Sequence, residues 1–115
     1  MSNNINYGIV GVGHLGCFHV KQIKKISSIK NIAIYDVVHK RALRIAKENG
    51  VTVCGSLDEL FGLVDAVSVV TPTCTHFDVA STALDFGCHV FIEKPISDNA
   101  KKASLLIKKA RRKKL

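Results

Sequence analysis

Residues 11–16 read GVGHLG, a G-x-G-x-x-G pattern that directly follows the apolar run NYGIV at residues 6–10. An apolar run that ends at glycines and continues into an amphipathic stretch is typical of a strand, a tight turn and a helix. In such a turn Gly11 permits the sharp bend, Gly13 lets a pyrophosphate approach the backbone, and Gly16 lets the helix pack closely on a sheet. The pattern predicts a dinucleotide-binding turn, and the alternative is a glycine-rich turn that holds no ligand.

The rest of the chain alternates short apolar runs with helical periodicity, which predicts a three-layer α/β fold with a parallel sheet of about five strands. After the first strand, further strands are expected at residues 31–36, 51–54, 65–71 and 88–92. The run at 65–71 is the most apolar and is expected to be central. Spacing predicts that the helices bury three sets of residues: Leu15, Phe18, Ile23 and Ile26; Ala42, Ile45 and Ala46; and Val79, Ala80, Ala83 and Leu84.

The ends of the helices carry their own signals. Gly50 and Gly87 are expected to end two helices, because glycine adopts the left-handed conformation that follows a helix C-terminus. Ser56 with Glu59 has the spacing of a capping box, and so does Thr75 with Asp78. The last helix is expected to begin at a cap formed by Ser97 or Asp98.

The 115 residues correspond to one domain, residues 1–115, and their net charge is +8. The excess lies in the C-terminal segment 98–115, where eight lysines and arginines follow residue 100 with no acid among them. Such a segment can contact nucleic acid, but it also has an apolar stripe formed by Ala100, Ala103, Leu106, Ile107 and Ala110. We therefore favour a helix with a solvated basic face and a frayed end, and expect no nucleic-acid partner.

No apolar run is long enough to span a membrane, and the N-terminal MSNNINYG lacks the features of a signal peptide. We expect a cytoplasmic protein without a membrane partner. Its four cysteines (17, 54, 74 and 88) form no C-x-x-C pair. His14, Cys17 and His19 lie close in sequence, but their spacing fits no zinc pattern, so we expect reduced thiols and no metal.

Asp36 ends the second expected strand, twenty residues beyond Gly16, where an acid accepts hydrogen bonds from the adenosine ribose. The exposed backbone of Val12, His14 and Leu15 is expected to bind the phosphates at the helix N-terminus. A carboxylate repels the 2′-phosphate of NADP, so the expected cofactor is NAD. The neighbouring Lys40 and Arg41 leave NADP possible.

Two further motifs follow the fourth and fifth expected strands: Thr71-Pro72-Thr73-Cys74-Thr75-His76 and Glu93-Lys94-Pro95. Together with GVGHLG, in this order and spacing, they resemble the N-terminal domain of the glucose–fructose oxidoreductase / inositol dehydrogenase (Gfo/Idh/MocA) family. The resemblance covers essentially the whole chain. The GVGHLG motif is similar to that of members acting on nucleotide-linked amino sugars.

The resemblance implies a Rossmann domain of an oxidoreductase that transfers a hydride between nicotinamide and a hydroxyl carbon of a sugar or cyclitol. It implies that Thr71, Pro72 and Thr73 lie along the cofactor, with His76 and Glu93 beside it. It also implies that Lys94 lies near the nicotinamide ribose and the substrate and orients the reacting hydroxyl. From the residues themselves, Lys94 can instead form a surface ion pair with Glu93, and His76 and His89 are expected to be structural. Pro95 can follow a cis peptide bond.

The family resemblance also implies a larger second domain that carries an Asp/His pair for acid–base chemistry, together with a sixth strand. The 115 residues include neither, so we expect a truncated NAD(P)-binding domain without turnover of its own. The alternative is a stand-alone dinucleotide-binding or interaction module. The uncharged segment 88–92 is then an edge strand, and we expect it to promote self-association.

Overall fold

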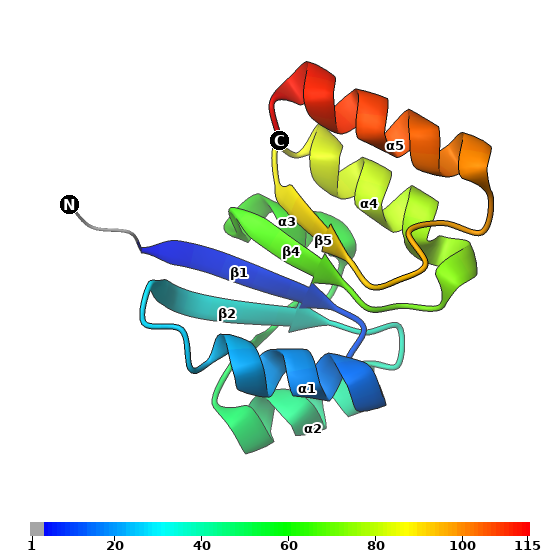
Figure 1. Cartoon of the computed structure of the whole chain (residues 1–115). Helices are drawn as coiled ribbons and strands as arrows, with labels where there is room; N and C mark the ends of the chain where they lie inside the picture. Colours follow the sequence, from blue (N-terminus) through cyan, green and yellow to red (C-terminus); the bar gives the residue numbers. More distant parts are fainter. Residues whose placement is uncertain (1–3) are drawn as a thin grey trace.

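A five-stranded parallel sheet forms the centre of the molecule in the computed structural model, which describes residues 4–115 (Figure 1). The strands are β1 (Ile5–Val10), β2 (Ile29–Tyr35), β3 (Thr52–Val53), β4 (Ala66–Val69) and β5 (His89–Ile92), in the order β3-β2-β1-β4-β5. This arrangement confirms the predicted α/β fold with five parallel strands. The central position belongs to β1, whereas β4 lies next to it, so the expectation that the most apolar run is central was wrong by one strand.

Helices cover both faces of the sheet, as Figure 1 shows. One face carries α1 (His14–Ile23) and α2 (His39–Asn49); the other carries α3 (Leu57–Leu63), α4 (His76–Asp85) and α5 (Ala100–Lys113). A short 3₁₀ turn, η1 (Thr73–Thr75), precedes α4. The core is correspondingly divided, with Val20 and Ile45 packed on one side of the sheet and Phe61 and Val79 on the other.

The helices with strong periodicity lie as predicted. In α2 the buried residues are Ala42, Ile45 and Ala46, and Gly50 follows with φ 67°. In α4 the predicted apolar face is buried, and Gly87 follows with φ 85°. Ser56 caps α3, since its hydroxyl oxygen accepts a hydrogen bond from the Glu59 amide at 3.1 Å.

The buried face of α1 differs from the prediction. Leu15 and Phe18 are 46% and 49% exposed, and Ile26 is exposed beyond the end of the helix. The buried residues of α1 are instead Gly16 and Val20, one helical turn apart. Gly16 packs against the Gly11 carbonyl, and this close approach turns the Gly16 side of the helix toward the sheet.

Two predicted caps are also wrong. The Thr75 hydroxyl makes no cap hydrogen bond to α4; it lies 2.6 Å from the Thr71 hydroxyl and 2.7 Å from the Pro72 carbonyl oxygen. The last helix is capped by Asn99, not by Ser97 or Asp98, and its side-chain oxygen accepts from the Lys102 amide at 2.8 Å. The Thr75 hydroxyl donates to neighbouring groups instead of capping α4. At the last helix, the adjacent Ser97, Asp98 and Asn99 each have a side-chain oxygen, so local spacing alone does not select the cap.

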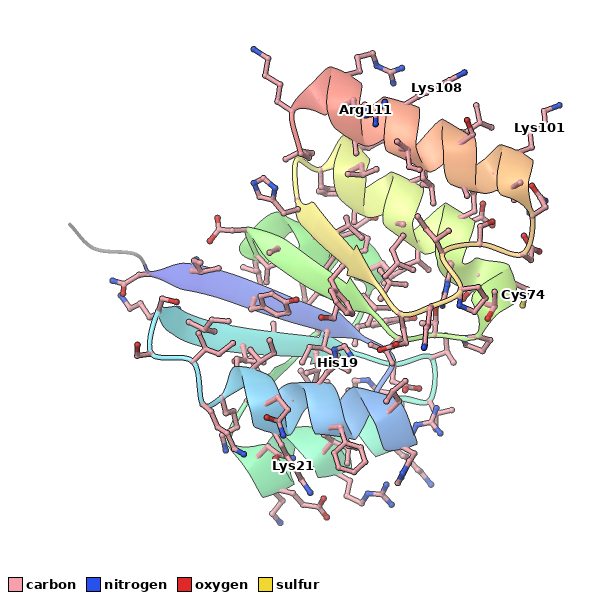
Figure 2. All side chains as sticks on the ribbon, viewed as in Figure 1. His19, Lys21, Cys74, Lys101, Lys108 and Arg111 are labelled. Atoms are coloured by element: carbon pink, nitrogen blue, oxygen red, sulfur yellow. The ribbon has the colours of Figure 1, made fainter. Side chains whose placement is uncertain are left out.

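The basic C-terminal segment is helical to Lys113, so the expected frayed end was wrong. Leu106 is buried against α4, where Leu115 also packs, while Ala100 and Ile107 are exposed and do not belong to the buried stripe. Lys101 and Lys108 project from α5 into solvent in Figure 2. Lys109 instead pairs with Asp85 at 2.6 Å. Within residues 4–115, the structure contains no helix long and apolar enough to cross a membrane.

Candidate functional site

The glycine turn lies between β1 and α1, at the carboxyl edge of the sheet, and its three glycines differ in their surroundings. Gly11 has φ 93°, and a Cβ there would lie 2.7 Å from the Val70 carbonyl oxygen. A Cβ on Gly16 would collide with the Gly11 carbonyl oxygen. A Cβ on Gly13, by contrast, would meet no atom within 4 Å. Two glycines are therefore required by the fold, whereas Gly13 faces open space that a ligand can enter.

The first turn of α1 points its backbone amides at this space. Gly13 is the N-cap, no side chain caps the helix, and the first intrahelical bond to the cap runs from the Cys17 amide to the Gly13 carbonyl at 2.9 Å. The amides of His14 and Leu15 precede that bond and so have no partner inside the helix. Unpaired amides and the helix dipole attract an anion.

Val12 does not share this arrangement. It is fully buried, and its amide donates a hydrogen bond to Asp36 Oδ2 at 2.9 Å. The expectation that the Val12 backbone is exposed was therefore wrong. The amide stabilises the turn by tying it to the end of β2.

Asp36 follows β2 and is 4% exposed. Besides the Val12 amide, its carboxylate accepts from the Val38 amide at 2.8 Å and from Arg41 Nε and Nη2 at 3.2 and 3.0 Å. Burial alone raises the pKa of Asp36, but the hydrogen bonds from Arg41 and the two amides outweigh it and hold the pKa below its ordinary value. The group is therefore an anionic acceptor at neutral pH.

A cleft of about 500 Å³ joins these features at the carboxyl edge of the sheet. Its residues come from the glycine turn, the end of β2, α2, α3 and the segment that leads into α4: Val10, Gly11, Gly13, Tyr35, Asp36, Val37, Arg41, Leu57, Val70, Thr71, Pro72, Thr75 and Val79. Most of the wall is apolar, and the charged residues among the lining are Asp36 and Arg41. An apolar slot, a carboxylate and free helix amides together match the base, ribose and phosphates of a dinucleotide.

The segment Thr71–His76 forms one wall of this cleft and is held by His76. The imidazole is 1% exposed, with Nδ1 at 2.9 Å from the Pro95 carbonyl oxygen and Nε2 at 2.8 Å from the Thr71 carbonyl oxygen. His76 therefore joins the loop after β4 to the loop after β5. His76 is not among the residues that line the cleft. Thr73 lies in η1, beside the lining residues Pro72 and Thr75.

The Glu93–Lys94–Pro95 segment follows β5 at the same edge of the sheet, and its Lys94–Pro95 bond is cis, as the sequence suggested. Glu93 does not pair with Lys94. Its Oε2 lies 3.0 Å from the Nε2 of His19. In Figure 2, His19 lies on the side of α1 that faces the sheet. Lys94 is exposed, and its amine forms no salt bridge or hydrogen bond with any residue from 4 to 115. The free ammonium remains available to a ligand.

Sequence reasoning missed His19 and the apolar lining of the cleft. Periodicity assigns Val79 to the core and says nothing of Leu57, and only the fold places both residues in the cleft. The sequence assigns no role to His19 beyond excluding it from a zinc site, and its partner Glu93 is 74 residues away. No signal within α1 identifies that partner.

The cysteines and histidines of α1 do not come together as ligands. Cys17 Sγ lies 3.3 Å from the Val12 carbonyl oxygen, and His14 stacks edge-on against Phe18. Across residues 4–115, no cluster of three or more His, Cys, Asp or Glu side chains has the arrangement of a metal site. Burial raises the pKa of the Cys54 and Cys88 thiols, so neither is an activated nucleophile.

Comparison with known proteins agrees with the geometry. The chain is 43% identical over 100 residues to UDP-N-acetylglucosamine 3-dehydrogenase of Acidithiobacillus ferrooxidans, covering 87% of this chain and 31% of that protein. It is 32% identical over 116 residues to scyllo-inositol 2-dehydrogenase (NAD(+)) of Bacillus subtilis, covering 94% of this chain and 34% of that protein. The crystal structure of the Acidithiobacillus enzyme superposes with a TM-score of 0.91 at 40% identity, over 97% of this chain and 36% of the other.

This chain therefore spans about a third of the length of these relatives. Residues 5–115 match the Gfo/Idh/MocA oxidoreductase family, in the part described as its NAD-binding Rossmann fold. With the glycine turn, Asp36, the TPxxxH segment and Glu93-Lys94-Pro95 at one edge of one sheet, the chain belongs to the Gfo/Idh/MocA family, whose NAD-binding Rossmann domain it contains.

Proposed function

We propose that the cleft binds NAD(H), as the cofactor-binding part of an oxidoreductase that acts on a hydroxyl carbon of a sugar-like substrate. The observation that carries the proposal is Gly13. Gly13 faces open space beside the free amides of α1 and lines the same cleft as Asp36. The free amides of α1 can donate hydrogen bonds to a diphosphate, and the Asp36 carboxylate can accept them from a ribose.

Each group in the cleft has a defined task. The His14 and Leu15 amides bind the phosphates, Asp36 binds the adenosine ribose, and Thr71 and Pro72 form the wall along the cofactor. NAD is proposed in preference to NADP because Asp36 is anionic and a 2′-phosphate beside it is repelled.

The chemistry requires a group at the reacting hydroxyl, and we propose Lys94. Nicotinamide, when bound, supplies the hydride acceptor or donor. Lys94 leaves the same edge of the sheet as the glycine turn, and its ammonium has no acidic partner in the described part of the chain. A positive charge there stabilises a developing alkoxide and orients the hydroxyl.

The proposed substrate class is a nucleotide sugar or a cyclitol, because the relatives are named for UDP-N-acetylglucosamine and scyllo-inositol. The chain spans about a third of the length of those enzymes, and the part proposed for these 115 residues is cofactor binding. A stand-alone dinucleotide-binding module is the second candidate, and steady hydride transfer by the 115-residue chain would exclude it. The four free cysteines favour a reducing compartment, and we propose the cytoplasm.

The test is a titration of the full 115-residue chain with NADH, followed by nicotinamide fluorescence. We expect saturable binding, weakened by about tenfold or more in Gly13→Ala, because the added Cβ enters the space that the diphosphate needs. Gly62→Ala is the matched control: its Cβ also meets no atom within 4 Å, but Gly62 does not line the cleft. Absence of saturable binding by the wild-type chain up to millimolar NADH would refute the proposal.

A further inference from the structure

The Asp36 carboxylate has no spare acceptor position. Oδ1 accepts from the Val38 amide and from Arg41 Nη2, and Oδ2 accepts from the Val12 amide and from Arg41 Nε. A carboxylate offers about four lone-pair positions, so these four bonds fill it. A ribose that brings its hydroxyls to Asp36 must displace at least one of these donors.

Of the donors, only Arg41 can leave without disturbing the fold. The Val12 and Val38 amides are backbone groups at the glycine turn and at the start of α2, and Val12 is fully buried. The Arg41 side chain is 40% exposed and lines the rim of the cleft. Rotation of its guanidinium into solvent frees one position on each oxygen of Asp36, the number that a ribose diol needs.

We propose that Arg41 determines cofactor specificity by competing with the adenosine ribose for Asp36; this inference rests on the proposed binding of NAD(H). While Arg41 holds the carboxylate, the ribose position is closed, so NAD(H) binds only the fraction of molecules in which Arg41 has moved away. The displaced guanidinium stays beside the ribose, where it offsets the charge of Asp36 against a 2′-phosphate. Arg41 thus weakens NAD(H) binding and permits NADP(H) binding.

The sign of this effect separates competition from simple contact. If Arg41 merely touched the cofactor, its removal would weaken binding of both dinucleotides. Competition requires that removal tighten NADH binding, because Asp36 then stands open. It also requires that NADPH binding weaken, because the carboxylate is no longer offset by a cation.

The experiment compares Arg41→Ala and Arg41→Gln with the wild-type chain in fluorescence titrations with NADH and NADPH. We expect NADH affinity to rise at least about threefold and NADPH affinity to fall about tenfold in both variants. Lys47→Ala is the matched control, since Lys47 is an exposed cation in the last turn of the same helix and does not line the cleft. It should leave the affinities for NADH and NADPH unchanged. Thermal unfolding of each variant verifies that it is folded.

A second measurement uses the wild-type chain, so it does not depend on how the variants fold. In ¹H–¹⁵N spectra, the Arg41 Nε–H signal should lose its hydrogen-bonded character as NADH saturates the protein. Unchanged or weaker NADH binding in the folded variants would overturn the inference, as would an Arg41 signal that stays hydrogen-bonded at saturation. If the wild-type protein binds NADH and either of these contrary results is found, only the competition by Arg41 is refuted. If the wild-type protein does not bind NADH, the proposed function is refuted as well.

Discussion

His19 Nε2 on α1 lies 3.0 Å from Glu93 Oε2, and this pair links the helix of the glycine turn to the loop that carries Lys94. Both side chains are largely shielded, so we expect a coupling energy of about 0.5–1 kcal/mol in a double-mutant cycle of His19→Ala and Glu93→Ala. Urea unfolding of the four proteins provides the measurement. The cycle separates the pair from the packing of His19 on Phe91. Strict additivity would show that the pair contributes nothing.

His76 should be among the most sensitive positions outside the apolar core. His76→Ala removes the imidazole that lies within hydrogen-bond distance of the Thr71 and Pro95 carbonyl oxygens and leaves a cavity, at a cost of about 2–4 kcal/mol in unfolding free energy. Chemical denaturation measures the loss. His89→Ala is the control, since His89 is exposed on β5 and its loss should cost less than about 0.5 kcal/mol. Equal losses in the two variants would contradict the structural role of His76.

Gly16→Ala should be poorly tolerated although alanine favours helices. Its Cβ would overlap the Gly11 carbonyl oxygen, so α1 must move away from the sheet, at a cost of about 3 kcal/mol or more. Thermal unfolding against Gly62→Ala, which has open space in α3, isolates this collision from helix propensity. A Gly16→Ala protein as stable as wild type would show that the helix does not depend on this contact.

Stability should fall in acid partly through Asp36. The pKa of this group is lower in the folded protein than the ordinary 3.8, so its stabilisation is complete above that value and is lost as pH falls through the folded-state pKa. Unfolding free energies measured between neutral pH and about pH 2 test this. Asp36→Asn should lower stability at neutral pH and flatten the acid limb of the curve. An unchanged acid limb in Asp36→Asn would assign the effect to other carboxylates.

The edge strand β5 should promote self-association. Phe91 on β5 is 53% exposed, and no strand of residues 4–115 pairs with its outer side. An uncharged, apolar edge recruits further strands, so Phe91→Lys should shift the chain toward monomer in sedimentation experiments. Leu43→Lys, at an exposed apolar position on α2, is the control and should have no such effect. A wild-type chain that stays monomeric at high concentration would contradict this prediction.

Local signals predicted most of the fold. The periodicity of α2 and α4, with Gly50 and Gly87 after them, was sufficient because the residues that a 3.6-residue repeat selects are the ones that these helices bury. It was insufficient for α1, where the contact of Gly16 with Gly11 determines which face is buried. The glycines and Asp36 were identifiable from spacing along the chain. Two contacts were not identifiable from spacing: the hydrogen bond from the Val12 amide to Asp36 and the contact of His19 with Glu93. Both depend on which strands of the folded sheet end side by side.

The double attachment of Asp36, to the Val12 amide and to Arg41, bears on how cofactor preference can be re-engineered or can drift in evolution. Replacing the acid after β2 removes the charge that opposes the 2′-phosphate of NADP, but here that change also releases the glycine turn from its anchor. A library built at Asp36 will therefore mix altered preference with damaged folding. Position 41 lies on the rim and anchors no backbone, which makes it the safer starting point for changing preference while keeping the scaffold intact.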